Sequence, residues 1–175
     1  DPQAIYYSQQ AVENLDASGL DSNYTSTYYP WILVRDTVNN TQIYLPPTGE
    51  VCRNLALTDN IAFPWFASAG YTRGLVNSVK ARIKLTQEDR DTLYQGRINP
   101  IATFSDVGTV IWGNKTLQIA DTALNRLNVR RLLLQARKLI SAVAVRLLFE
   151  QNDQIVRQQF LDSVNPILDA IRRDR

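Results

Sequence analysis

The chain has 175 residues, 45% hydrophobic and 21% charged, which is typical of folded protein and excludes a disordered or collagen-like chain. It has no histidine, and this excludes Ser-His-Asp and Cys-His catalysis and His-ligated zinc or haem. The single cysteine, Cys52, cannot form an internal disulfide. With no histidine to activate its thiol, we interpret Cys52 as a small buried side chain without a redox role.

The sequence shows no features that would target it to a membrane or to secretion. No apolar run approaches the roughly 20 residues that a membrane span needs, and no basic flank precedes an apolar stretch at the N-terminus. The chain begins Asp1-Pro2-Gln3 and contains no methionine, so we expect a processed protein or a fragment of a longer one.

Charge is distributed unevenly along the chain. Residues 1–77 carry three basic and seven acidic side chains, a net charge of −4, whereas residues 126–175 carry ten basic and five acidic ones, a net charge of +5. Such asymmetry is explained by two differently solvated faces, by head-to-tail contact between copies, or by a basic face that meets an acidic partner.

The first half of the sequence predicts short mixed elements. Ala4–Leu15 has weak helical periodicity, and the aromatic and β-branched run Tyr28–Val34 predicts one strand, with Pro30 tolerated near its start or on an edge. Thr41–Leu45 predicts a second strand, and Glu50–Thr58 has the spacing of a short helix.

The middle of the chain combines loops, strands and one capped helix. Residues 63–70 are apolar but contain proline and glycine, which favours an ordered loop packed on the core. Ser78–Leu85 alternates between apolar and polar residues, as a half-buried strand does. Thr86 and Asp89 have the spacing of a capping box, which predicts a helix ending near Gly96.

Two further strands are predicted at Ile101–Phe104 and Thr109–Trp112. Because Trp31 and Trp112 lie in strand-like runs beside β-branched residues, we expect both indole rings in the core.

Two long helices are predicted after residue 126. The first has an apolar stripe on one side, formed by Val129, Leu132, Leu133, Ala136, Leu139, Ile140, Val143 and Leu147. Asp153 is placed to cap the second, whose stripe is Val156, Phe160, Val164, Ile167 and Ile171. Pro166 predicts a kink or a fresh helix start.

Basic side chains lie opposite the first of these stripes. Arg126, Arg130 and Arg137 lie on the opposite side, with Arg131 and Lys138 beside them. We consider this basic helical face a solvated surface, a site for carboxylates of a protein partner, or a phosphate site. The spacing alone does not decide among these.

Few residues suggest catalysis. The sequence has no glycine-rich nucleotide loop, so we expect no cofactor and no catalytic or metal-binding residues. The pair Asp16 and Asp21 keeps open a carboxylate-dependent metal hydrolase, and the basic helix keeps open nucleic-acid binding. We interpret Glu88, Asp89 and Asp91 as helix-capping or solvated carboxylates.

Eight segments, in this order, resemble the tail sheath proteins of contractile-tailed bacteriophages and of phage-derived injection particles. They are 28–31 with 34–36, 45–51, 69–70 with 73–74, 91–94, 98–101, 108–117, 127–132 and 149–152. The resemblance runs from about Thr27 to the end. This chain departs from the family at Ala56-Leu57-Thr58-Asp59 and Ser68-Ala69-Gly70, and it lacks the family's upstream domains and final C-terminal strands.

The resemblance implies a mixed α/β fold. It assigns residues 1–124 to the C-terminal part of a subtilisin-like α/β sheath domain that lacks catalytic residues. Residues 125–175 would form the helical part of a smaller C-terminal sheath domain.

The resemblance also implies a function as a structural, non-enzymatic subunit of the virion tail, assembled in the host cytoplasm. Such subunits polymerise around a tail tube, contact baseplate and terminator proteins, and contract to drive the tube through the cell envelope. It implies no direct nucleic-acid contact and no membrane insertion. On this view Arg130, Arg131, Arg137 and Lys138 include contacts to neighbouring subunits or to the tube.

Overall fold

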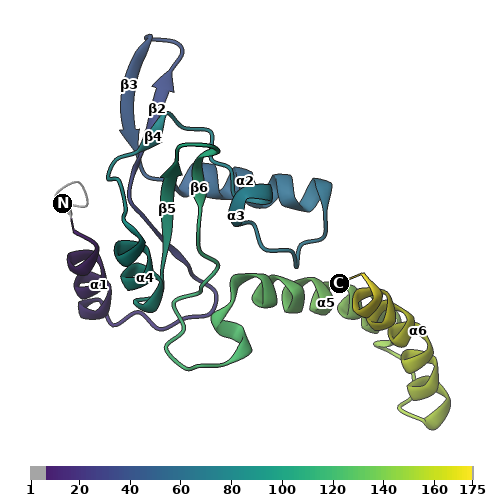
Figure 1. Cartoon of the computed structure of the whole chain (residues 1–175). Helices are drawn as coiled ribbons and strands as arrows, with labels where there is room; N and C mark the ends of the chain where they lie inside the picture. The colour runs from purple at the N-terminus through teal and green to yellow at the C-terminus, as the bar shows by residue number, and fades with distance from the viewer. Residues whose placement is uncertain (1–6, 175) are drawn as a thin grey trace. The chain divides into compact units, whose positions relative to one another are not determined.

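A computed structural model describes residues 7–174, which form a mixed α/β fold (Figure 1). The chain divides into two compact units, Asp1–Arg130 and Arg131–Arg175. Its strands are β1 (Thr27–Tyr29), β2 (Ile32–Asp36), β3 (Thr41–Leu45), β4 (Lys80–Ala81), β5 (Ile98–Phe104) and β6 (Gly108–Ile111). Its α-helices are α1 (Ser8–Ala17), α2 (Thr48–Ile61), α3 (Gly70–Arg73), α4 (Gln87–Gln95), α5 (Leu127–Ala144) and α6 (Gln154–Arg173), with 3₁₀ turns η2 (Ala123–Asn125) and η3 (Val145–Leu147).

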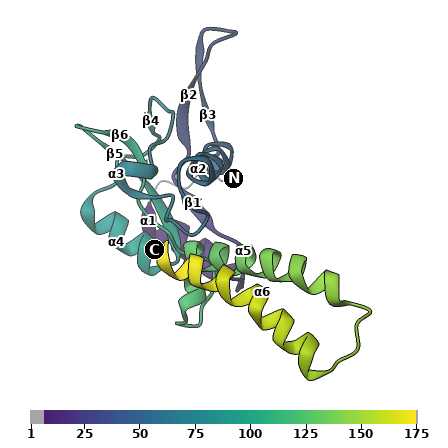
Figure 2. The same cartoon turned by 90° about the vertical axis from the view of Figure 1, so that its right-hand side faces the viewer.

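The first unit contains two three-stranded sheets. In one sheet, β5 lies between β1, which is parallel to it, and β6, which is antiparallel. In the other, β2 lies between β3 and β4, both antiparallel to it. The β2–β3 hairpin projects beyond the rest of the unit (Figures 1 and 2). Every residue of β3 is exposed.

Side chains cover both faces of β5. Ile98 packs in one cluster with Leu15 of α1 and Leu93 of α4. Ile101, three positions along the strand and therefore on the opposite face, packs in a second cluster with Val51 of α2. Residues 98–102 are consequently all buried, as expected for a strand covered on two sides.

The predicted strand Tyr28–Val34 is wrong as a single element. The chain forms β1, leaves that sheet at Pro30, and enters the other sheet as β2. Proline has no backbone N–H to donate to a sheet, so the strand ends where the ladder would require one. One apolar run therefore contributes to both sheets.

The predicted strand Ser78–Leu85 is also largely wrong. Only β4, two residues long, pairs with β2. Ala81 and Leu85 are buried, whereas Val79 is exposed. The alternating pattern therefore correctly identified part of a buried side but overestimated how far the backbone stays paired.

Other expectations agree with the structure. The strands predicted at 101–104 and 109–112 are β5 and β6, and α2 is longer than the predicted Glu50–Thr58. The predicted helix at Ala4–Leu15 corresponds to α1, although its residues 4–6 lie outside the described part of the chain.

Cys52 is exposed, so its interpretation as a buried side chain was wrong. Its position in α2 points it away from the face that packs Val51.

The second unit is a pair of helices, the α5 segment from Arg131 onward and α6. Asp153 caps α6 by accepting a hydrogen bond from the Val156 N–H, as predicted. The helix continues through Pro166 without a fresh start. Of residues 131–174, only Val164 is fully buried, and Leu133, expected in the apolar stripe, is exposed. Among the described residues, none of the helices could cross a membrane.

The predicted capping box at the start of α4 is confirmed. The Thr86 hydroxyl accepts a hydrogen bond from the Asp89 N–H, and the Asp89 carboxylate accepts one from the Thr86 N–H at 3.0 Å. The same carboxylate accepts a hydrogen bond from Ser8 Oγ at 2.7 Å, which links α4 to α1. Hydrogen bonds from Thr86 and Ser8 lower the pKa of Asp89 below its ordinary value.

We expect Asp89→Ala to destabilise the chain by about 1 kcal/mol at pH 7. Because the folded pKa is lowered, this stabilisation is present above the unfolded pKa of about 3.9 and is lost as the pH falls through the folded value. Urea unfolding at pH 7 and at progressively lower pH should therefore show the gap between wild type and Asp89→Ala narrowing. The control Glu88→Ala, in the same helical turn, should stay within about 0.5 kcal/mol of wild type at pH 7. A gap that is unchanged at low pH would contradict this assignment.

Candidate interaction sites

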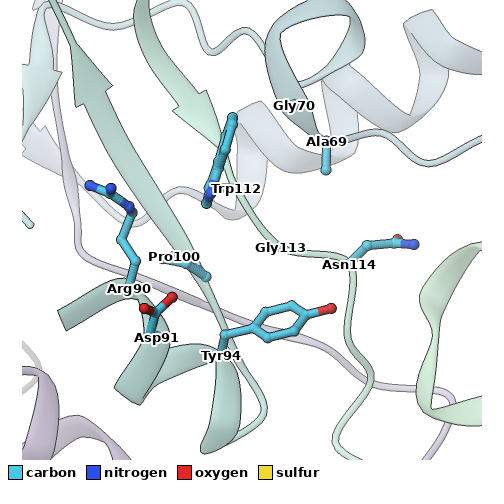
Figure 3. A pocket seen from close by; sticks show the side chains of 9 residues that line it. All are labelled: Ala69, Gly70, Arg90, Asp91, Tyr94, Pro100, Trp112, Gly113 and Asn114. Atoms are coloured by element: carbon cyan, nitrogen blue, oxygen red, sulfur yellow. The ribbon is translucent and has the colours of Figure 1, made fainter. Parts of the chain in front are cut away.

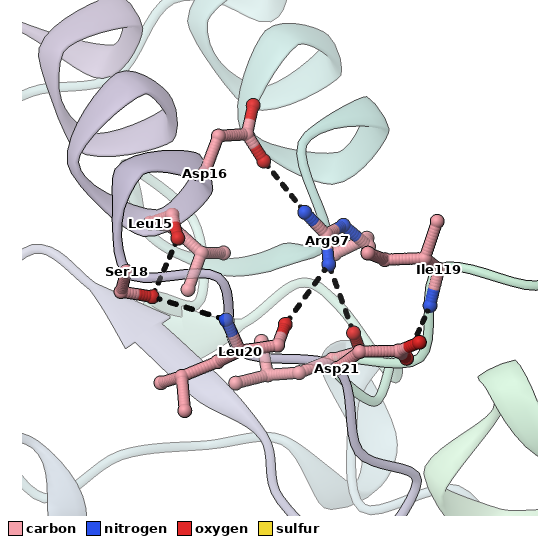
Figure 4. Close-up of polar contacts among 8 residues, drawn as sticks. Leu15, Asp16, Ser18, Leu20, Asp21, Arg97 and Ile119 are labelled. Atoms are coloured by element: carbon pink, nitrogen blue, oxygen red, sulfur yellow. Dashed lines mark hydrogen bonds and ion pairs between the residues drawn. The ribbon is translucent and has the colours of Figure 1, made fainter.

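The carboxylates proposed as catalytic candidates make structural contacts instead. Asp16 pairs with Arg97 at 2.6 Å between carboxylate and guanidinium, and Asp21 accepts a hydrogen bond from the Ile119 N–H at 2.9 Å (Figure 4). Arg97 also donates to the Leu117 carbonyl. Within residues 7–174, no group of three acidic or cysteine side chains is placed to hold a metal ion. Asp16 thus joins α1 to the turn before β5, and Asp21 joins the loop after α1 to the segment before η2.

A pocket of about 390 Å³ lies in the first unit, beside α4 and the end of β6 (Figure 3). Four of the eight resemblance segments meet there, although they are far apart in the sequence. They contribute Gly70, Tyr94, Pro100 and Trp112 with its neighbours Gly113 and Asn114. The fold therefore brings residues from four sequence segments, which are far apart along the chain, together in one pocket.

The wall of this pocket depends on a close approach between β5 and the segment after β6. A Cβ atom on Gly113 would lie 2.6 Å from Asn99 Oδ1 and 2.8 Å from Asn99 Cα, so any larger residue would push the two segments apart. The Asn99 amide is buried. It donates to the Thr27 and Lys115 carbonyls and accepts from the Lys115 N–H, which ties three segments together.

The polar side chains of the pocket are both basic and acidic. Arg90 donates to the Leu85 carbonyl and to Gln87, and its guanidinium lies 5.3 Å from the centre of the Phe104 ring. Asp91 is exposed and accepts a hydrogen bond from Gln87. The site can therefore bind an aromatic or apolar group on its wall and a charged group at its edge, but it presents no nucleophile with a base.

Trp112 is not a core residue, which corrects the sequence-based expectation. Its side chain is 36% exposed and lies against the rings of Tyr71 and Phe104, at centroid distances of 4.9 and 5.0 Å. Trp31 is half-buried. Trp112 directly follows β6, where Val110 and Ile111 are buried, and its backbone N–H still donates to the Pro100 carbonyl, but its ring lies at the surface.

Two basic side chains lie near the ring of Tyr94. Lys115 Nζ lies 4.4 Å and the Arg126 guanidinium 5.5 Å from the ring centre, and Arg126 also donates to the Tyr94 hydroxyl. These contacts add two cations beside the pocket. The sequence analysis did not identify this group of Tyr94, Lys115 and Arg126. The sequence indicated only that Tyr94 and Lys115 each lie in a segment that resembles the sheath family.

The structure separates the four predicted basic contact residues into two kinds. Arg130 is half-buried, donates to Asn23 Oδ1, and places its guanidinium 4.2 Å from the centre of the Tyr24 ring. Arg131 is also half-buried, whereas Arg137 and Lys138 are exposed. Only Arg137 and Lys138 therefore match the expectation of a freely presented basic face, and contacts of any of the four with a partner stay a prediction.

The second unit presents apolar side chains at its surface. A hollow of about 420 Å³ lies between Ala144, Leu147, Val156, Phe160 and Leu161. At the turn between the helices, Leu148 is exposed and Phe149 fully so. Exposed apolar groups of this kind commonly mark contact surfaces.

Comparison with known proteins supports the resemblance. The chain is 34% identical over 169 residues to the tail sheath protein of Vibrio phage KVP40, covering 94% of this chain and 24% of that protein. It is 32% identical over 144 residues to the tail sheath protein of Enterobacteria phage T4, covering 82% of this chain and 21% of that protein. The chain thus spans about a quarter of the length of these curated relatives. No family model matches the sequence.

Solved structures of contractile sheaths have a similar fold. The fold matches a sheath complex of an extracellular contractile injection system, PVC, in its contracted state with a TM-score of 0.82 and 25% identity, covering 94% of this chain and 45% of that one. In sequence and fold, this chain is similar to the sheath proteins of contractile tails and injection systems.

We expect Arg130→Ala to destabilise the chain by about 1 kcal/mol, because it removes the contacts to Asn23 and Tyr24. Arg137→Ala, at the same helical face but exposed, should change stability by less than about 0.5 kcal/mol. Urea unfolding of the two variants checks this difference. Equal effects would mean that the Arg130 contacts contribute nothing to folding.

Proposed function

We propose that this chain is part of a structural subunit of a contractile phage tail sheath. The observation that carries the proposal is the match over 94% of the chain to a phage tail sheath protein in sequence and to a contractile injection-system sheath in fold. Subunits would polymerise in a helical lattice around a tail tube, contact baseplate and terminator proteins, and contract to drive the tube through the host envelope. The chain would act without catalysis.

On this proposal, the free energy that drives contraction is stored when the subunits assemble. An extended lattice that is kinetically trapped can convert to one that buries more complementary surface, so the motion needs no ATP. The exposed apolar groups of the second unit support this view, because they leave surface for such burial. Strand addition from neighbouring arms is the further contact we propose, and the exposed strand β3 offers an unpaired edge for it.

Residues 1–124 would belong to a subtilisin-like sheath domain and 125–175 to the C-terminal sheath domain. The particle would be a virion tail assembled in the host cytoplasm. A phage-derived injection particle is the second candidate, favoured by the match to the PVC sheath complex.

Electron microscopy tests the proposal. The complete reading frame that encodes this chain should be expressed alone and together with the tube protein of the same tail. We expect striated hollow sleeves, wider without the tube than around it. Dispersed monomers in both samples would contradict a sheath function while leaving the fold unaffected.

The exposed basic pair gives a more specific prediction. Reversing both charges, Arg137→Glu with Lys138→Glu, should leave folding intact because both side chains are exposed. It should nevertheless reduce sleeve formation by about tenfold, through lost or repelled carboxylate contacts. Pelleting assays measure the assembled fraction. The matched control is Arg172→Glu with Arg173→Glu, at the exposed end of α6. Normal assembly of the 137/138 variant would remove these residues from the interface.

A further inference from the structure

We propose that the pocket beside α4 receives the Phe149 tip of a second copy of this chain. The tip is the turn between the two helices of the second unit, residues 148–153, and the pocket belongs to the first unit. This inference rests on the proposed sheath function, because it names one contact between sheath subunits. It concerns side-chain docking, which is distinct from strand addition.

The tip presents an apolar anchor. The Phe149 side chain is fully exposed, and Leu148 beside it is 66% exposed. A phenylalanine buries about 150–250 Å² when it docks, and such aromatic anchors dominate the energy of many interfaces. Docking this ring against a partner would remove its apolar surface from water, which favours the contact.

The pocket has the matching shape and chemistry. Its volume of about 390 Å³ leaves room for an aromatic ring, and Trp112 and Tyr94 provide aromatic walls (Figure 3). The Trp112 ring is partly exposed and already packs with Tyr71 and Phe104, so an entering ring would extend an existing aromatic cluster. Such ring pairs contribute about 0.5–1.5 kcal/mol beyond area burial.

The charges of the two surfaces are complementary. Residues 148–153 carry two carboxylates, those of Glu150 and Asp153, and no basic side chain. Around the pocket, Arg90, Lys115 and Arg126 outnumber the single carboxylate of Asp91. An exposed Glu150 beside a seated Phe149 would therefore meet an excess of positive charge.

The occupant is a second copy because one chain carries both halves of the contact. A tip on one unit and a pocket on the other make a heterologous, head-to-tail contact, which generates rings or open helical arrays. Such a contact suits the helical sheath lattice of the proposed function.

Site-directed cross-linking tests the inference in the complete protein. In a Cys52→Ser background, Asp91→Cys places a thiol at the pocket and Gln151→Cys one at the tip, where Phe149 stays intact, on separate preparations, with a size tag on one of them. After mixing under assembly conditions and oxidation, we expect a two-chain product about tenfold more abundant than with the control pair Asp91→Cys and Ile155→Cys. Ile155 is exposed on the same unit but outside the tip.

Phe149→Ala provides an independent readout. It should raise the concentration needed for sleeve assembly by about tenfold, whereas Ile155→Ala should change it less than about twofold. Circular dichroism of each variant before assembly verifies folding. Equal effects of the two substitutions would count against the anchor role of Phe149.

The outcomes separate this inference from the proposed function. Sleeves without the cross-link would overturn the docking but leave the sheath function standing. The cross-link without sleeves would support the docking and count against the sheath function, and neither product would overturn both. A cross-link formed within a single chain that carries both Asp91→Cys and Gln151→Cys, with no two-chain product, would overturn the choice of a second copy as occupant.

Discussion

The buried amide of Asn99 is the interaction on which the first unit depends. Its side chain bonds to backbone groups of Thr27 and Lys115, so one residue on β5 fixes the positions of β1 and of the segment after β6. Gly113 can then pack directly on Asn99, since it has no Cβ. The wall of the pocket follows from that contact, because Trp112 and Asn114 flank Gly113.

The two units solve the problem of burying apolar surface in different ways. In the first, β5 is covered on both faces by clusters that include α1, α4 and α2, which makes this unit a rigid scaffold. In the second, among residues 131–174, Val164 alone is fully buried. Much of the second unit's apolar surface therefore remains exposed in this chain.

The charged side chains also fall into two groups, those that make contacts within the chain and those that stay at the surface. Asp16, Asp89 and Arg130 act within the chain, through Arg97, the α4 capping box, and Asn23 with Tyr24, respectively. Arg137 and Lys138 remain exposed. A basic stripe read from helical periodicity therefore contains both structural and surface residues, and only tertiary contacts distinguish them.

The sequence by itself determined the mixed α/β class, the capped helices at Thr86 and Asp153, and the resemblance to sheath proteins, because capping, periodicity and ordered motifs are local signals. Only the tertiary structure decided that the run at 28–34 contributes to two sheets, that Cys52 and Trp112 lie at the surface, and that distant motifs meet in one pocket. The physical reason is that burial and strand pairing depend on which segments pack together, and those partners lie far away in the sequence.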